Sequence, residues 1–396
     1  MKQRRSAIFP PGRMRPMKNS CHDYTFGKIL SIGEKSQTHR QPQNSGKHME
    51  LSAGKYWSLR RLADANGYFK MTAVDQRPGV EALVASRRPD GKSAYEDVGA
   101  IKELLIQELS PYSSAMLVDP GYAFPYGYRS LDPSKGLLVT AEQWDCEEDA
   151  GGRRTLLYPN WSVEKIKRMG ADGVKLMLWY RPDASPDTLK HQQALVEAVG
   201  AECRRHDIAF LLEPLVHPFL SEAGSPEYRE DPNKRPEMVI DTVKEFRKER
   251  YGVDIFKLET PLPANTIADP DADSPESRSA QEWFNQIDLL LDRPWVMLSA
   301  GAGMEPFRRV LTYAFRAGAS GYLAGRAIWW GAAEQFPDLD AFRAQIRAQG
   351  VPYAEKIQHT LQQYGRPWTE KMGVKGEVRL SHAGPSFYEN YPACQR

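Results

Sequence analysis

Three charged side chains interrupt short apolar segments in which a protein core ordinarily contains only aliphatic residues. Lys175, Glu213 and Lys257 each lie within such a segment. Desolvation and a neighbouring positive charge lower the pKa of a lysine and make its amine a nucleophile. Lys257 could then form a Schiff base with a ketone, with Glu213 moving protons and Lys175 either lowering the pKa of Lys257 or holding a phosphate. The alternative is that Glu213 only pairs with the two lysines and leaves them neutralised and inert.

Small residues and an arginine follow two later apolar segments. Ser299 begins the run Ser-Ala-Gly-Ala-Gly, which contains Gly301 and leads into a helix signal. Gly325 and Arg326 follow the next segment. Small residues let backbone N–H groups approach an anion, and a helix N-terminus favours negative charge. These residues together predict a site for a phosphate or a similar oxyanion.

These side chains need a scaffold, and the sequence contains eight short runs rich in β-branched and apolar residues. We expect strands at residues 69–75, 114–119, 136–142, 173–179, 209–213, 254–259, 295–299 and 320–325. Amphipathic segments between and after them predict helices at residues 94–109, 162–169, 186–206, 236–251, 280–291, 305–317 and 339–349. Eight alternating strands and helices most economically close into a (β/α)8 TIM barrel, a single catalytic domain of the α/β class.

An open, doubly wound sheet is the alternative fold. The Gly-rich turn that a nucleotide-binding sheet has after its first strand is absent, because residues 74–78 read Val-Asp-Gln-Arg-Pro. In a barrel, by contrast, the carboxyl ends of all strands meet at the catalytic face. The polar residues at the predicted strand ends are Asp75, Gln76, Arg77, Asp119, Glu142, Lys175, Glu213, His217, Lys257, Glu259, Ser299 and Arg326.

The sequence around these strand ends resembles the class I tagatose-1,6-bisphosphate aldolases. The similar blocks run in order through nearly the whole of residues 51–365. They are Ala-Val-Asp-Gln-Arg at 73–77, Leu-Val-Asp-Pro-Gly at 117–121, Pro-Asn-Trp-Ser at 159–162, Ala-Asp-Gly-Val-Lys at 171–175, Phe-Leu-Leu-Glu at 210–213, Val-Asp-Ile-Phe-Lys-Leu-Glu at 253–259, Leu-Ser-Ala-Gly at 298–301 and Ala-Gly-Arg-Ala-Ile-Trp at 324–329. The blocks are specific as a set, whereas most of them are not specific singly.

The resemblance implies a metal-independent retro-aldol cleavage of a ketohexose 1,6-bisphosphate, foremost tagatose 1,6-bisphosphate. The products would be dihydroxyacetone phosphate and glyceraldehyde 3-phosphate, and no cofactor is needed. By motif, Lys257 resembles the Schiff-base lysine and Glu213 the proton-transfer residue. Residues that resemble groups contacting the substrate, or supporting such groups, are Asp75, Gln76, Arg77 and Lys175. Residues that resemble a phosphate cradle are Ser299, Gly301, Gly325 and Arg326.

Two departures from the family pattern touch the rim of the expected pocket. Pro78 stands where the family more often has Gly, and Thr-Pro-Leu-Pro at residues 260–263 replaces the commoner Val-Pro-Val. Sulfofructose-phosphate aldolases share several of the same blocks, and a sulfonate and a phosphate are both tetrahedral oxyanions. The sequence therefore also fits a sulfofructose-phosphate aldolase with the same mechanism.

Two further classes of protein are weaker alternatives. A non-catalytic sugar-phosphate sensor on the same barrel would keep the cradle without needing Lys257 and Glu213 together. A metal-dependent aldolase would need histidines at strand ends, and only His217 lies next to one. We therefore expect an enzyme, an aldehyde-lyase, with no metal site.

Composition and charge indicate the class of protein, its location and its partners. The chain has 396 residues, 41% of them hydrophobic and 26% charged, as in an ordinary globular protein. No run approaches the roughly 18 to 20 apolar residues that cross a bilayer, and no apolar signal core follows the basic start, so we expect a cytoplasmic protein and no membrane contact. Outside residues 1–48, 43 basic and 49 acidic residues remain, which does not predict a nucleic-acid surface. The expected partner is a small sugar phosphate, and the resemblance allows a homodimer.

The chain divides into three predicted regions. Residues 1–48 are basic, lack an apolar period and are expected to be a disordered leader. This leader fits a transit peptide, a tail that contacts anionic partners or an upstream extension of the reading frame, which we favour because Met49 opens a compact start. Residues 49–365 form the predicted aldolase barrel. Residues 366–396 mix Gly, Pro, Lys and Ser without a period and are expected to be an irregular C-terminal tail, packed in part through Trp368 and Tyr388.

Overall fold

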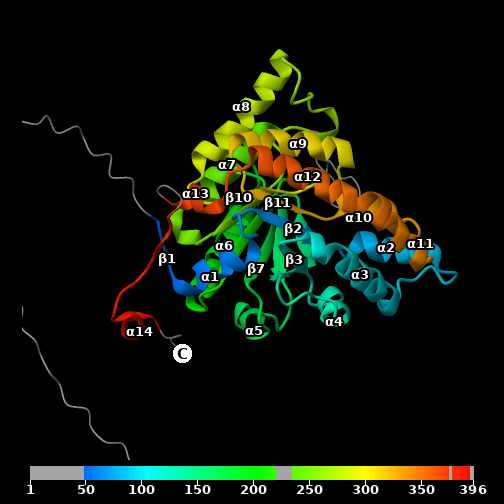
Figure 1. Cartoon of the computed structure of the whole chain (residues 1–396), viewed down its shortest axis with the longest axis horizontal. Coiled ribbons are helices and arrows are strands. Elements are labelled where there is room, and N and C mark those ends of the chain that lie inside the picture. Colours follow the sequence, from blue (N-terminus) through cyan, green and yellow to red (C-terminus); the bar gives the residue numbers. More distant parts are fainter. Residues whose placement is uncertain (1–48, 220–233, 374–376, 393–396) are drawn as a thin grey trace, which may run out of the picture. The chain divides into compact units, whose positions relative to one another are not determined.

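The computed structural model of the chain describes residues 49–219, 234–373 and 377–392 (Figure 1). The predicted basic leader, residues 1–48, lies outside these ranges. Within them, no helix has the length and apolar character needed to span a membrane.

Eight parallel strands form a closed barrel. In their order around the barrel, the strands are β10 (Trp295–Met297), β11 (Gly321–Ala324), β2 (Phe69–Ala73), β3 (Ala115–Val118), β4 (Gly136–Thr140), β7 (Gly173–Trp179), β8 (Ala209–Leu215) and β9 (Ile255–Leu258), which pairs with β10. Their residues are mostly apolar on both faces, as buried parallel strands require. Each strand lies within or close to its predicted run, so the (β/α)8 barrel is confirmed and the open sheet is wrong.

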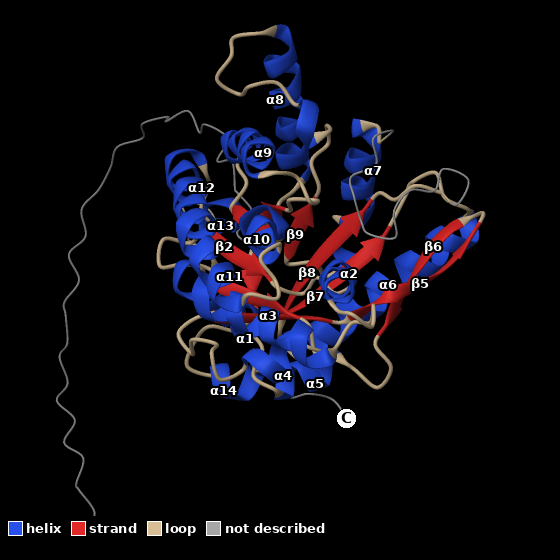
Figure 2. Cartoon of the chain, turned by 90° about the vertical axis from the view of Figure 1, so that its right-hand side faces the viewer, coloured by secondary structure: helices blue, strands red, loops and turns tan. Residues whose placement is uncertain are grey.

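Helices cover the outside of the strands, as Figure 2 shows. They are α2 (Pro78–Arg87), α3 (Tyr95–Leu109), α4 (Ala123–Gly127), α5 (Val163–Arg168), α6 (Pro186–Arg205), α7 (Pro236–Phe246), α8 (Pro275–Leu290), α9 (Met304–Ala317), α10 (Arg326–Ala333), α11 (Leu339–Gln345) and α12 (Val351–Tyr364). All seven predicted helices are present with shifted ends. α8 begins five residues earlier than expected, because Ser274 and Ser277 form a capping box at its start.

A β-hairpin between β4 and α5 departs from the prediction. β4 ends at Thr140, and Glu142 begins β5 (Glu142–Asp149), which pairs antiparallel with β6 (Gly152–Leu157). Figure 2 shows this hairpin projecting beside β7 and β8. The sequence of β5 carries mostly charged and polar residues, so it lacks the apolar run that marks the other strands.

The amino ends of the barrel strands are closed by both ends of the described chain. α1 (Ala53–Leu62) packs there together with Trp368 of α13 (Trp368–Met372) in one apolar cluster. β1 (Glu50–Leu51) pairs with β12 (Arg379–Leu380), and α14 (Phe387–Asn390) follows. Trp368 is therefore buried at the barrel bottom, as expected for a partly packed tail, whereas Tyr388 is 77% exposed.

Candidate active site

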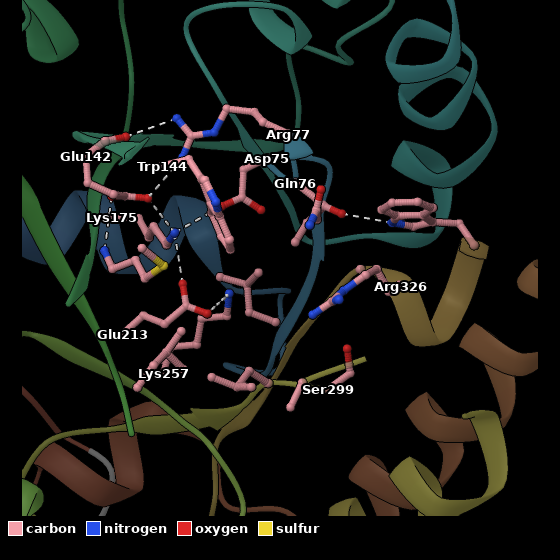
Figure 3. A pocket seen from close by; sticks show the side chains of 18 residues that line it. Asp75, Gln76, Arg77, Glu142, Trp144, Lys175, Glu213, Lys257, Ser299 and Arg326 are labelled. Carbon is pink, nitrogen blue, oxygen red and sulfur yellow. Dashed lines mark hydrogen bonds and ion pairs between the residues drawn. The ribbon is translucent and has the colours of Figure 1, made fainter. Parts of the chain in front are cut away.

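Most of the polar residues at the carboxyl ends of the strands line one cavity of about 640 Å³, a volume that includes its part open to solvent (Figure 3). Nine of the ten predicted site residues line it: Asp75, Gln76, Arg77, Lys175, Glu213, Lys257, Ser299, Gly325 and Arg326. The tenth, Gly301, lies beside Arg326 in the neighbouring cavity. The barrel thus brings together residues that are far apart in the sequence.

Lys175 lies at the centre of a buried ionic cluster. Its Nζ is 3.0 Å from Asp75 Oδ2, 2.7 Å from Glu142 Oε1 and 2.9 Å from Glu213 Oε2. The other carboxylate oxygen of Glu213 is 2.6 Å from Lys257 Nζ. Lys175 and Lys257 are only 3% and 5% exposed. Glu213 therefore bridges the two lysines, the pairing that the inert alternative predicts, while it also lies within proton-transfer distance of the Lys257 amine.

The charges in this cluster fix one another. Burial disfavours the charged form of Lys175, but its three carboxylate neighbours outweigh burial and raise the pKa of Lys175. Burial also opposes ionisation of Asp75, yet Lys175, Lys257 and Arg77 hold the pKa of Asp75 well below its usual range. For Glu142, burial prevails over its cationic neighbours and raises the pKa. At neutral pH, Lys175 is thus a fixed cation and Asp75 a fixed anion.

Lys175 donates hydrogen bonds to Asp75 and Glu142 and forms an ion pair with Glu213, so its ammonium group is occupied within the cluster. This arrangement suits a residue that holds carboxylates in place better than one that holds a phosphate. The positive charge of Lys175 is also balanced by Asp75, Glu142 and Glu213, the last of which it shares with Lys257. Sequence patterns alone do not reveal this balance, because the three acids come from three different strand ends.

Glu142 is a site residue that the motif comparison did not assign. Its carboxylate accepts a hydrogen bond from the Met177 N–H at 3.0 Å and contacts Lys175. Arg77 Nη1 donates to the Glu142 carbonyl at 3.1 Å and to the Tyr158 hydroxyl at 2.7 Å. Arg77 is itself buried, so it supports Glu142 and the hairpin rather than presenting an open guanidinium. The sequence does indicate Glu142 as a candidate, because it is a charged residue at the end of a predicted buried strand.

The turn after β10 and the start of α10 form a compact cradle. Ala300 and Gly301 have positive φ angles of 48° and 78°, so the chain turns sharply there. A Cβ atom on Gly301 would lie 3.2 Å from Arg326 Cζ. A Cβ atom on Gly325 would lie 2.7 Å from the Ala73 carbonyl oxygen. Both positions therefore favour glycine, and they bring backbone close to the Arg326 guanidinium at the starts of α9 and α10.

Three of the other polar strand-end residues serve the scaffold. Asp119 forms an ion pair with buried Lys102. Glu259 accepts the Val216 N–H at 2.6 Å and pairs with Lys234, which lies just before α7. His217 is buried, and burial lowers its pKa to about 4. In the described ranges, no group of three or more His, Cys, Asp or Glu side chains is placed to hold a metal ion.

Comparison with known proteins identifies the family of this barrel. A family model described as DeoC/LacD family aldolase matches residues 69–331. Tagatose 1,6-diphosphate aldolase 2 of Streptococcus agalactiae serotype III (strain NEM316) is 32% identical over 331 residues, which cover 82% of this chain and 100% of the relative. Tagatose 1,6-diphosphate aldolase of Lactococcus lactis subsp. lactis is 32% identical over 332 residues, with the same coverage.

Among solved structures, a fructose-bisphosphate aldolase from Plasmodium falciparum superposes with a TM-score of 0.59 at 12% identity. The match covers 81% of this chain and 98% of that chain, and it supports the fold alone. The family-model match and the two bacterial relatives identify the family as well as the fold. The chain therefore belongs to the DeoC/LacD family of aldolases, as its resemblance to class I tagatose-bisphosphate aldolases predicted, and it is an aldehyde-lyase.

Proposed function

We propose that the chain is a metal-independent class I aldolase that cleaves a ketohexose 1,6-bisphosphate, foremost tagatose 1,6-bisphosphate, to dihydroxyacetone phosphate and glyceraldehyde 3-phosphate. The observation that carries this proposal is the bridging position of Glu213, 2.6 Å from Lys257 Nζ and 2.9 Å from Lys175 Nζ. One carboxylate thus reaches the amine that would attack the ketone, while a fixed cation holds that carboxylate in place. The names of the bacterial relatives support the substrate class.

The geometry supports the following sequence of steps. Lys257 transfers a proton to Glu213 and its amine attacks the C2 carbonyl of the open-chain sugar. Glu213 returns the proton to the departing hydroxyl, so that water leaves and an iminium ion forms. The iminium ion takes up the electron pair of the C3–C4 bond while the C4 hydroxyl loses its proton to a carboxylate, and the aldehyde departs. Protonation of the enamine at C3 and hydrolysis release dihydroxyacetone phosphate and restore Lys257.

Neighbouring residues would hold the substrate during these steps. The C1 phosphate fits the cradle of Ser299, Gly301, Gly325 and Arg326, where backbone N–H groups and a guanidinium meet. Gln76 Oε1 accepts the Gly79 N–H at 3.0 Å, which leaves the Gln76 amide nitrogen as a donor toward the substrate. Asp75, kept ionised by its cationic neighbours, is an acceptor for a substrate hydroxyl.

Trapping of the imine tests the proposal directly. The protein is mixed with dihydroxyacetone phosphate and borohydride in the presence of EDTA, and its intact mass is measured. We expect a covalent adduct on the wild-type protein and none on Lys257→Ala, because reduction makes the imine permanent. A folded wild-type protein that forms no adduct would contradict the Schiff-base mechanism and favour the sugar-phosphate sensor.

A substrate panel then resolves the sugar. We expect cleavage of tagatose 1,6-bisphosphate with the highest kcat/KM, and a higher value for sulfofructose 1-phosphate would favour the sulfofructose-phosphate aldolase instead. Fructose 1,6-bisphosphate differs from the tagatose compound at one hydroxyl stereocentre and belongs in the same panel. A homodimeric state and a cytoplasmic location of this protein remain predictions.

A further inference from the structure

The hairpin β5–β6 stands directly across the barrel mouth from the oxyanion cradle. The cradle follows β10 and β11, and the hairpin connects β4 to the segment that leads to β7. In the closed order of eight strands, β4 is four places from β10, and β7 is four places from β11. Four of eight places is the opposite side of a closed barrel. A substrate anchored by its phosphate at the cradle would therefore extend past Lys257 toward the hairpin.

Trp144 is the hairpin residue that reaches the reaction cavity. It lines the same cavity as Lys175 and Lys257, and Figure 3 shows its indole lying over the ionic cluster. Its ring meets that of Trp179 edge to face, with the ring centroids 5.6 Å apart. It packs against an apolar cluster that includes Met177 and Trp179. Contacts of this kind hold a large aromatic side chain in one position.

A second cavity lies on the other side of Trp144. It has about 990 Å³ of space, including its part open to solvent, and shares only Arg77 and Trp144 with the reaction cavity. These two side chains therefore form the partition between the cavities. The second cavity is lined mainly by groups that can hydrogen-bond: Glu81, Tyr95, Tyr122, Gln143, Asp145 and Tyr158. Hydroxyl, amide and carboxylate groups of this kind suit a polyhydroxylated chain better than an apolar one.

We infer that Trp144 determines specificity by limiting the length of the aldehyde that the enzyme releases or accepts. Its indole ends the reaction cavity at the far side from the cradle, so a three-carbon aldehyde fits in front of it. Removing the indole would take away the larger apolar part of the partition and leave Arg77, so that longer polyhydroxylated aldehydes could extend beside it into the second cavity. This inference rests on the proposed aldolase function.

The condensation direction is the suitable test, because the two reactants bind in separate parts of the site. The C3 carbon of the enamine on Lys257 attacks the aldehyde carbon, and a carbon–carbon bond forms. The aldehyde oxygen takes up a proton and becomes a hydroxyl, and water then releases the ketose from the lysine. Trp144 affects only the aldehyde, so formation of the dihydroxyacetone phosphate adduct should not depend on it.

The experiment compares Trp144→Ala and Trp144→Leu with the wild-type protein. Leu retains apolar packing on Met177 but removes the indole, which covers the case in which the Ala variant fails to fold. Trp57→Ala is the matched control, since Trp57 is 60% exposed on α1 at the other end of the barrel. Each protein is assayed for the borohydride-trapped adduct, and for kcat/KM with glyceraldehyde 3-phosphate and erythrose 4-phosphate.

We expect the trapped adduct in every variant. The ratio of kcat/KM for erythrose 4-phosphate to that for glyceraldehyde 3-phosphate should rise about tenfold or more when the indole is removed, the scale on which pocket size discriminates substrates. Trp57→Ala should leave the ratio unchanged. An unchanged ratio in folded Trp144 variants, or loss of their adduct, would overturn the inference. Absence of an adduct on the wild-type protein would instead contradict the proposed aldolase function.

Discussion

The two ends of this barrel both contain buried lysines, but their ionic arrangements differ. At the amino end, Lys55 Nζ lies 2.7 Å from one carboxylate, that of Asp254, which also accepts the Phe210 N–H at 2.8 Å. At the carboxyl end, Lys175 contacts three carboxylates, and one of these, Glu213, also contacts Lys257. The first arrangement is a closed pair beside an apolar cluster, whereas the second faces a cavity.

The difference shows that burial of a lysine is not by itself a sign of function. A closed pair with its hydrogen bonds satisfied can hold two elements together, here α1 and the start of β9, and do nothing else. A shared carboxylate beside a cavity leaves a proton acceptor between two amines, where a ligand can reach it. The same substitution at the two ends should therefore have opposite consequences.

Lys257→Met should produce the largest effect. We expect turnover to fall by about 10⁵-fold or more, as when a catalytic nucleophile is removed, because Met cannot form the imine. Stability should change by only about 1 kcal/mol, since Glu213 retains Lys175. Steady-state cleavage assays and thermal melts measure the two quantities. Turnover within a hundredfold of the wild-type value would remove Lys257 from the mechanism.

Glu213→Gln should lower kcat by about 10² to 10⁴-fold, the usual contribution of a general acid or base. Gln keeps the shape of Glu but cannot take the proton from Lys257. The rate of adduct formation with borohydride, followed by mass spectrometry, should fall with kcat. Asp183→Asn, outside the cavity lining, is the comparison, and equal losses in both variants would mean that Glu213 has no specific role.

Lys55→Met should instead destabilise the fold by about 3 to 5 kcal/mol, because Asp254 is left buried without its cation. The turnover of the folded fraction should be unchanged. Urea unfolding and active-site titration separate the two effects. The double variant Lys55→Met/Asp254→Asn should recover most of the loss, since the amide oxygen still accepts the Phe210 N–H. A fall in turnover per folded molecule would contradict the division between the ends.

Gly301→Ala should have the smallest effect and should affect binding. Its φ of 78° is strained for alanine, and the added Cβ would press on Arg326. We expect KM for the phosphorylated substrate to rise about tenfold with a smaller change in kcat. Gly303→Ala is the matched control in the same turn, because the nearest atom to its added Cβ would be Pro306 Cδ at 3.8 Å. Equal KM values in the two variants would place the phosphate elsewhere.

The sequence predicts the barrel well because each strand is a short apolar run followed by polar residues. It does not reveal the β5–β6 hairpin, since residues 142–149 carry mostly charged and polar side chains that resemble a loop. Trp144 is missed with it. Packing of the tail through Trp368 is predicted, but its contact with α1 is not, because the two segments lie far apart in the sequence.

The sequence predicts which residues form the candidate site better than it predicts how their side chains contact one another. Lys257, Glu213 and the cradle residues follow from their motifs and strand ends. That Lys175 is surrounded by Asp75, Glu142 and Glu213 depends on side-chain geometry across β2, β4, β7 and β8, which no local pattern encodes. The same geometry explains why Arg77 is a buried support instead of an open contact for the substrate.

The pairing of β2 with β11 has a consequence for how the enzyme is made. This seam joins residues 69–72 to residues 321–324, and the Trp329 indole N–H reinforces it by donating to the Ala73 carbonyl at 3.0 Å. Asp75 and Arg326 stand on its two sides and become neighbours only when the last strand arrives. A growing chain on the ribosome therefore carries Lys175 and Lys257 long before the barrel that surrounds them is closed. Asp75 and Arg326 can line one cavity only after residue 326 of the 396 has been added.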